Sequence, residues 1–186
     1  MAAKIIKPAQ GIILISEPIL QDYYFRQSVV LLAEHNEDGS FGIIINKPLD
    51  TKLNEVLPDF PDYNMKVYLG GPVSTENLYF IHTHPEIPKS LRILPGLFWG
   101  GDIDTIRDMI QAGKATENDL RFFVGYAGWH PKQLDREISE KSWVLSQTTV
   151  KNIITKKPEA LWSNYIKNMG KDYAIWANFP ADPSSN

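Results

Sequence analysis

The apolar residues in the first half of the chain occur in short runs rather than at helical spacing. Ser28 to His35 and Phe41 to Asn46 are such runs, and β-branched side chains are frequent in them, as is typical of buried strands. Turn-forming Asn, Asp and Gly lie between them at 36–40, so the pattern predicts an antiparallel hairpin. Similar runs predict further strands at Gly11 to Ser16, Val67 to Leu69, Leu78 to His82, Phe122 to Tyr126 and Trp143 to Ser146.

Helical spacing of apolar residues appears mostly later in the chain. A short helix is predicted from Thr51 to Leu57, with Thr51 as its cap. Asp102 is a good N-cap for a longer helix that Gly113 is expected to end. Two more helices are predicted from Pro131 to about Glu140 and from Pro158 to Met169, and the prolines from Pro85 to Pro95 predict an irregular segment.

This order of elements bears on the fold class. Strands that pair as hairpins come early and helices come mostly late, which favours an α+β fold over a doubly wound parallel sheet. The sequence contains no internal repeat, linker or low-complexity block. We therefore expect a single domain over residues 1–186, with the tail from about residue 178 loosely held.

Composition and charge narrow the classes of function. The net charge is −3 and the pI is near 5.8, so no overall attraction to nucleic acid or to an anionic membrane is expected. The absence of cysteine excludes disulfides, a thiolate nucleophile and cysteine-ligated zinc. The segment from Met1 to Lys7 is too short and too interrupted by charge to be a signal peptide. The apolar runs are too short to span a bilayer. We expect a cytoplasmic protein with no membrane partner.

The stretch 121–137 holds the densest group of unusual residues. A strand leads into Gly125 and Gly128, then Trp129, then the start of a helix near Pro131. A glycine turn before a helix N-terminus offers free N–H groups to an anion, and Lys132 would add charge. The spacing matches neither the dinucleotide fingerprint nor the phosphate loop. The alternative is that the glycines permit a tight turn while Trp129 packs over the sheet edge.

Two other glycine turns, Gly70-Gly71-Pro72 and Gly100-Gly101-Asp102, would line a cleft if they converged on the first, although each could also be simple turn geometry. Gln133 and Glu137 share a helical face and could form a polar patch toward a ligand or partner. The candidate binding surface comprises Asn46, Lys47, Pro48, Gly70, Gly71, Pro72, Gly125, Gly128, Trp129, Gln133 and Glu137.

Support for catalysis or a metal is thin. His82-x-His84 has metal-ligand spacing, and Glu34-His35 could complete a site, but the prolines that follow indicate a strand end. His35 and His130 have no Ser or carboxylate nearby at a recognisable triad spacing, although triad partners need not be close in sequence. Asp135 and Glu137 do not share a helical face, and the charges on the helix from Pro131 are too balanced for phosphate contacts. We expect no metal and no cofactor, and we regard nucleic acid as a poor partner.

A series of motifs, in one order along the chain, resembles the AlgH/YqgE family of bacterial proteins over almost the whole length. The motifs are Glu34-His35, Asn46-Lys47-Pro48, Gly70-Gly71-Pro72-Val73, Gly125-Tyr126-Ala127-Gly128-Trp129, Gln133-Leu134 and Pro158 with Trp162. The resemblance implies an α+β fold with a bent or barrel-like, mostly antiparallel sheet flanked by helices. It implies no particular activity or cofactor, although some members carry a transcriptional-regulator label. This chain has Lys132 where the family usually has Gly, and Asp135 where it usually has Glu.

Taken together, these observations favour a non-enzymatic binding or regulatory module with a protein or small-molecule partner. The alternative is a hydrolase or transferase that acts on a phosphorylated or acidic small molecule, with a histidine or Glu137 as base. A DNA-binding regulator follows from the family label alone. We expect a monomer or a homodimer, the latter because Trp129 and Trp143 could supply more aromatic surface than one core needs.

Overall fold

The computed structural model describes residues 6–20, 22–61, 65–155, 157–174 and 177. These residues form a ten-stranded sheet and a set of short helices. The strands are β1 Ile13–Ser16, β2 Val29–Asn36, β3 Gly39–Ile44, β4 Pro48–Lys52, β5 Lys66–Leu69, β6 Val73–His82, β7 Leu91–Leu94, β8 Leu97–Trp99, β9 Leu120–Trp129 and β10 Trp143–Ser146. The helices are α1 Leu53–Val56, α2 Ile103–Gln111, α3 Gln133–Ser139, α4 Val150–Ile153, the 3-10 turn η1 Pro158–Ala160, α5 Leu161–Asn168 and α6 Lys171–Ala174.

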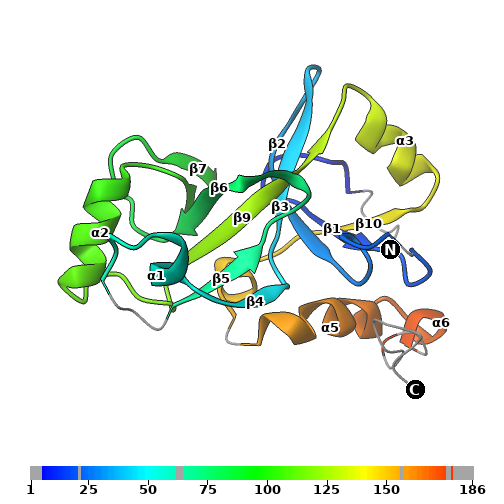
Figure 1. Cartoon of the computed structure of the whole chain (residues 1–186). Coiled ribbons are helices and arrows are strands. Elements are labelled where there is room, and N and C mark those ends of the chain that lie inside the picture. The colour runs from blue at the N-terminus through cyan, green and yellow to red at the C-terminus, as the bar shows by residue number, and fades with distance from the viewer. Residues whose placement is uncertain (1–5, 21, 62–64, 156, 175–176, 178–186) are drawn as a thin grey trace.

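Strand β9 is the centre of this sheet (Figure 1). It pairs with β3 and β6 in antiparallel fashion and with β5 in parallel fashion. The main path of the sheet runs β10-β1-β2-β3-β9-β6-β8-β7, while β4 joins through β5. The α+β class is therefore confirmed, with an open and mostly antiparallel sheet.

Apolar residues on the two faces of the sheet pack against different helices. In β1, Ile13 and Ile15 belong to the cluster that includes Trp162 and Ile166 of α5, whereas Leu14 belongs to the cluster under α3. This alternation is the period of two that a strand requires when both of its faces are buried. A third cluster joins α2 to the other end of β9, so α2 and α3 lie at opposite ends of the central strand (Figure 1).

The predicted hairpin of β2 and β3 is confirmed, with Asn36 opposite Gly39 across the turn. The predicted helix caps have mixed outcomes. Asp102 accepts a hydrogen bond from the Thr105 N–H and caps α2 as expected. The Thr51 cap is wrong, because Thr51 belongs to β4, which pairs with β5, and the N-cap of α1 is Lys52.

Two segments are more regular than the sequence indicated. The region from Pro85 to Pro95 was predicted to be irregular, yet it contains β7, whose Leu94 pairs with Leu97 of β8 across Pro95-Gly96. Pro followed by Gly is a turn signal that fits a hairpin, and Gly96 has φ +81°. Likewise, the predicted glycine turn after Tyr126 is wrong, because β9 continues as a strand through Trp129. The tail predicted to be loose lies outside the described residues.

Candidate functional site

The glycines of the candidate surface meet where three strands approach one another closely. A Cβ on Gly70 would lie 2.2 Å from the Gly125 carbonyl oxygen, and a Cβ on Gly125 would lie 2.4 Å from the Gly71 oxygen. The Gly70 N–H donates to Val124 O, and its carbonyl accepts from the Ile44 N–H, so Gly70 ties β3 to β9. These glycines allow backbones to touch, and they leave no space for a ligand between them.

Gly128 differs from the other glycines. It is exposed, it lies opposite Phe41 in the β3–β9 ladder, and its φ lies outside the left-handed region. A Cβ on Gly128 would lie 3.2 Å from the Tyr126 ring and 3.9 Å from Val73 Cγ2. A hollow of about 500 Å³ lies over this residue, and we call it the Gly128 hollow. Its lining residues are Glu34, Asn36, Asp38, Gly39, Ser40, Phe41, Val73, Tyr126, Gly128, Trp129 and His130.

Glu137 and Gln133 form a structural lock rather than an open polar patch. One carboxylate oxygen of Glu137 accepts hydrogen bonds from the indole N–H groups of Trp129 and Trp143, both at 2.8 Å. The other oxygen accepts from Gln133 Nε2 at 2.9 Å. The two indoles are only 6% and 4% exposed, so they supply no aromatic surface for a homodimer, contrary to the expectation. Glu137 thereby fastens α3 to the sheet.

The helix start near Pro131 is also occupied by the chain itself. The His130 N–H donates to Gln133 Oε1 at 3.0 Å, and the Gln133 N–H donates to the His130 carbonyl. Helix α3 has seven residues, and its N-cap, Lys132, has φ +62°. These contacts give the predicted anion site no support.

Asn46, Lys47 and Pro48 lie away from the Gly128 hollow. The Asn46 side chain accepts from the Val29 N–H and donates to Gln27 O, and Lys47 Nζ donates to Tyr24 O at 2.5 Å. Burial lowers the pKa of Lys47 to about 8, and the positive charge of Arg26 acts in the same direction. Asn46 and Lys47 thus hold the loop before β2, whereas Pro48 lines a separate hollow beside Arg121.

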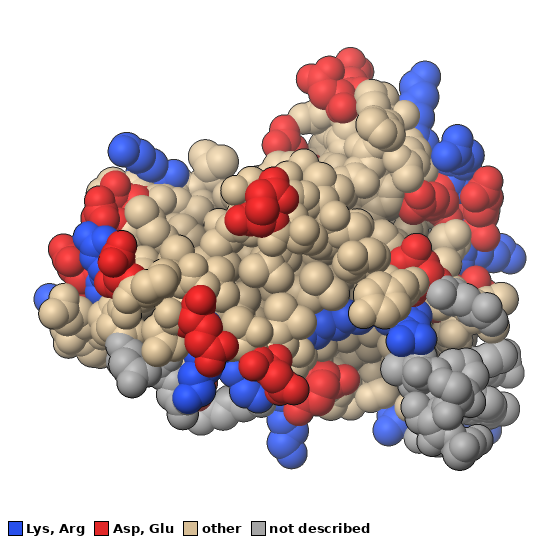
Figure 2. Space-filling view, viewed as in Figure 1, with Lys and Arg blue, Asp and Glu red and all other residues tan. Residues whose placement is uncertain are grey.

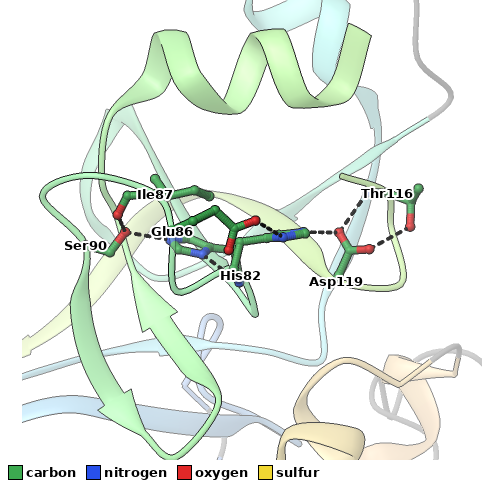
Figure 3. A network of polar contacts seen from close by, with 7 residues as sticks. His82, Glu86, Ile87, Ser90, Thr116 and Asp119 are labelled. Carbon is green, nitrogen blue, oxygen red and sulfur yellow. Dashed lines mark hydrogen bonds and ion pairs between the residues drawn. The ribbon is translucent and has the colours of Figure 1, made fainter. Parts of the chain in front are cut away.

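The two histidines of His82-x-His84 belong to a polar network that includes Glu86, Ser90 and Asp119 (Figure 3). His82 is fully buried, its Nδ1 accepts from the His84 N–H, and its Nε2 lies 2.8 Å from Gly100 O. This assigns the proton to Nε2, so His82 cannot accept a proton from Ser90 Oγ, which instead donates to Ile87 O. Burial lowers the pKa of His82.

His84 is bound to different partners from those of His82. Its Nε2 lies 3.1 Å from Asp119, and its Nδ1 lies 3.2 Å from Glu86. Asp119 in turn accepts from the N–H and hydroxyl of Thr116, so the network fixes the loop that precedes β9. Within the described part of the chain, no group of three or more His, Asp or Glu side chains is arranged to hold a metal ion.

The structure brings a serine and a carboxylate to His35, which the sequence spacing did not reveal. Ser40 Oγ lies 2.7 Å from His35 Nδ1 across the β2–β3 hairpin. Asp135 Oδ1, on α3, lies 4.0 Å from His35 Nε2 and is largely exposed. The sequence shows no recognisable triad spacing at His35, because the hairpin register and the docking of α3 are what place these neighbours there.

Comparison with known proteins identifies the family. A model of the AlgH-like family matches residues 13–174 of the chain. The chain belongs to the AlgH-like family. The resemblance inferred from its motifs is thereby confirmed.

Other AlgH-like relatives support the same assignment. The chain is 41% identical to a UPF0301 protein of Parabacteroides distasonis over 97% of its own length and 93% of that protein. It is 38% identical to a UPF0301 protein of Cytophaga hutchinsonii, with coverage of 95% and 98%. The names of these relatives state no activity.

Two solved structures have a similar fold. The solution structure of the AlgH protein from Pseudomonas aeruginosa has a TM-score of 0.73 at 28% identity, and the match covers 95% of this chain and 98% of that one. A crystal structure of a protein from Corynebacterium diphtheriae has a TM-score of 0.76 at 21% identity, with 96% of each chain covered, and shows likeness of fold alone. Among the described residues, no helix of this AlgH-like chain combines the length and apolar character needed to cross a membrane.

Sequence reasoning reached only part of the Gly128 hollow in this AlgH-like chain. Gly128 and Trp129 were among the candidates, and both line it. Phe41, Tyr126 and Ser40 were missed as lining residues, because their positions depend on the pairing of β3 with β9, two strands that are distant in sequence. Arg121 was also missed. Arg121 is buried, stacks over the Tyr68 ring and donates hydrogen bonds to the carbonyls of Ile153 and Thr155. No sequence pattern predicts this arrangement.

Proposed function

We propose that this AlgH-like protein is a non-enzymatic binding module and that its ligand occupies the Gly128 hollow. The observation that carries the proposal is an exposed glycine inside a strand whose backbone does not require one. Gly125 and Gly71 need to be glycine because a Cβ would meet main-chain atoms within 2.4 Å. At Gly128 an added Cβ would meet only side chains. A glycine in a strand interior costs about 0.5–1 kcal/mol.

That cost is explained if the missing side chain creates space. The Cβ of any other residue at position 128 would touch the Tyr126 ring, beside Val73, and would enter the hollow. The hollow's volume of about 500 Å³ lies within the usual range of ligand sites. Phe41 and Tyr126 give the hollow apolar walls. Its polar groups, which could orient a ligand, come from Asn36, Ser40 and the carboxylates of Glu34 and Asp38.

Binding is favoured over catalysis because the strongest acid–base candidates are engaged elsewhere. Both oxygens of Glu137 accept hydrogen bonds within the lock on α3, and both ring nitrogens of His82 have backbone partners. A phosphorylated or acidic substrate and a DNA duplex are also disfavoured at this site, because no Lys or Arg is among the residues that line the hollow.

The proposal is tested by two-dimensional NMR of the labelled protein with the amides of arginine, leucine and glutamate, a nucleotide and a sugar phosphate. We expect one class to shift the backbone signals of Gly39, Phe41 and Gly128. Gly128→Leu, which fills the hollow, should abolish those shifts, and Gly128→Ala should weaken them. Thermal melts followed by circular dichroism establish that both variants are folded. Shifts that lie elsewhere, shifts that persist in Gly128→Leu, or no shifts from the whole panel would overturn the proposal.

A second candidate function is a serine hydrolase, favoured by the contact between Ser40 Oγ and His35 Nδ1 at 2.7 Å. In that reaction His35 would take the hydroxyl proton as Ser40 Oγ attacks the acyl carbon of an ester, and would give the proton to the alcohol that leaves as the acyl–oxygen bond breaks. Water would then release the acyl group from Ser40 as the acid. It ranks second because Asp135 lies 4.0 Å from His35 Nε2, beyond hydrogen-bond distance. Hydrolysis of an activated ester such as p-nitrophenyl acetate, lost in Ser40→Ala and His35→Gln, would support it. A rate that is unchanged in both variants would exclude it.

A further inference from the structure

We propose that the ligand of the Gly128 hollow is a basic side chain, Lys or Arg, of a segment of another protein, and that a neighbouring apolar side chain of that segment occupies a second hollow. This inference rests on the proposed function and names the class of partner. The second hollow, of about 390 Å³, is called the Leu91 hollow here. Its lining residues are Gln10, Ala33, Glu34, His35, Phe41, Leu91, Arg92, Ile93 and Trp99.

The charge of the Gly128 hollow indicates a cation. Glu34 and Asp38 line it, both are exposed, and no Lys or Arg lines it. Among the described residues, neither carboxylate has a basic partner within ion-pair distance. Acidic atoms also cover the tip of the β2–β3 hairpin at the top of the molecule (Figure 2). A cation bound here would therefore gain attraction without displacing an existing ion pair.

Aromatic rings add to this preference. Phe41 and Tyr126 line the Gly128 hollow with their centroids 6.2 Å apart, and both rings are half-buried. Ammonium and guanidinium groups are attracted to aromatic faces and to carboxylates, and a site that has both favours them over neutral or anionic groups. Guanidinium fits especially well, because it can bond a carboxylate with two N–H groups and stack on a ring.

Continuity between the two hollows indicates a polypeptide rather than a free metabolite. Glu34 and Phe41 lie opposite each other in the β2–β3 ladder, and both residues line both hollows. Beyond Phe41 the rings of Trp99, Tyr79 and Tyr126 complete a circuit of contacts with centroids 5.5–6.2 Å apart. All four rings are half-buried, so together they form a partly exposed aromatic surface. Apolar surface of this kind is typical of protein–protein contact.

The Leu91 hollow suits an apolar side chain. Leu91 is 65% exposed, although large apolar side chains are usually buried, and Leu91, Trp99 and Phe41 give the hollow apolar surface. Arg92 also lines this hollow, and it would repel a second basic group. Glu34 lines both hollows, but Arg92 opposes its charge only in the Leu91 hollow, whereas Asp38 adds a second carboxylate only in the Gly128 hollow. This difference in charge places the basic residue of the segment over Gly128 and the apolar residue beside Leu91.

The test uses capped synthetic peptides that contain one arginine and one leucine, separated by an increasing number of glycines, with arginine amide as the small-molecule comparison. Affinity is measured by NMR titration of the 186-residue chain. We expect one spacing to bind at least about tenfold more tightly than arginine amide, which corresponds to about 1.4 kcal/mol. Added salt should weaken binding, because the carboxylates are exposed.

Matched variants separate the two hollows. Leu91→Ser should remove the advantage of the peptide and leave the affinity for arginine amide unchanged. Asp38→Asn combined with Glu34→Gln should weaken both ligands. All three side chains are exposed, so the variants are expected to fold, and melting curves verify this.

The outcomes distinguish this inference from the proposed function. If no peptide binds more tightly than arginine amide, the site binds a free cation and the polypeptide inference is wrong. If a peptide with glutamate in place of arginine binds as well, the charge argument is wrong. A neutral or anionic ligand located at Gly128 would overturn this inference and leave the proposed function intact, whereas no ligand at Gly128 would overturn both.

Discussion

Removal of the Glu137 carboxylate should destabilise the protein strongly, because three donors depend on it. Glu137→Ala leaves the N–H groups of Trp129 and Trp143 and the Gln133 amide without their acceptor. The two indoles are at least nine-tenths buried, and an unsatisfied buried donor costs about 1–3 kcal/mol. Water that enters the space left by the carboxylate would reduce the summed cost of the three unsatisfied donors. We therefore expect the free energy of unfolding to fall by about 3–5 kcal/mol.

Glu137→Gln is the matched control, since it retains shape and one acceptor. Both indoles bond the same carboxylate oxygen, so a glutamine oxygen placed there would keep both hydrogen bonds. The new amide nitrogen would then face Gln133 Nε2, and two donors would meet. Rotating the Gln133 amide would relieve this contact only by breaking its bond from the His130 N–H. We expect an intermediate loss of about 1–2 kcal/mol, which reflects one broken hydrogen bond.

The assay is urea unfolding followed by circular dichroism, which does not depend on the two tryptophans as probes. The indole N–H signals of Trp129 and Trp143 in NMR spectra report the lock directly, and both should move in Glu137→Ala. A loss below about 1 kcal/mol in Glu137→Ala would refute the reasoning, because a single exposed hydrogen bond would explain it. Equal losses in the two variants would also refute it, because the acceptor that glutamine retains would then make no difference.

Three further predictions follow from the backbone and from Lys47. Gly125→Ala should lower the free energy of unfolding by at least about 2 kcal/mol, because φ is +68° and the Cβ would lie 2.4 Å from Gly71 O. Gly128→Ala should change the free energy of unfolding by less than about 1 kcal/mol, and urea unfolding compares the two variants. The Lys47 pKa falls from 10.5 in the unfolded chain to about 8 in the folded protein, so protonation of Lys47 opposes folding. The free energy of unfolding should therefore rise between about pH 8 and 10.5. Lys47→Met should flatten that rise in unfolding curves recorded across this pH range, and an unchanged slope would contradict the prediction. Lys132→Gly should raise the free energy of unfolding by about 0.5–1 kcal/mol in the same assay, and a loss of stability would show that the lysine side chain contributes contacts that outweigh its conformation.

The sequence predicted local elements well, and it failed where long-range pairing decides the structure. The β2–β3 hairpin follows from runs and turn residues that are adjacent in the chain, and it was found. The continuation of β9 through Gly125 and Gly128 was missed, because glycine usually breaks a strand. Here the partners override that preference, since β3 pairs with residues 127–129 and Val73 of β6 pairs with Tyr126.

The same failure explains the incomplete site. Glycine, tryptophan and glutamine were chosen as candidates because they are unusual residues in one short motif. In the structure Gly125 permits close packing, Trp129 is anchored to Glu137, and Gly128 forms the floor of the hollow. Only the register with β3 separates these roles, and register between distant strands cannot be read from one sequence.

Lys132 shows how a departure from the family pattern acquires a physical meaning. The resemblance to the family implied glycine at this position, which raised the question of a ligand contact through bare backbone. Lys132 instead has φ +62°, a left-handed conformation that costs an L-residue about 1–2 kcal/mol and glycine almost nothing. Glycine also has greater conformational freedom in the unfolded chain, which offsets part of this gain. A net increase of about 0.5–1 kcal/mol in the free energy of unfolding is therefore expected. If Lys132→Gly stabilises the protein without changing ligand binding at Gly128, then the glycine of the family serves the turn into α3, and the binding site lies on the other side of the motif.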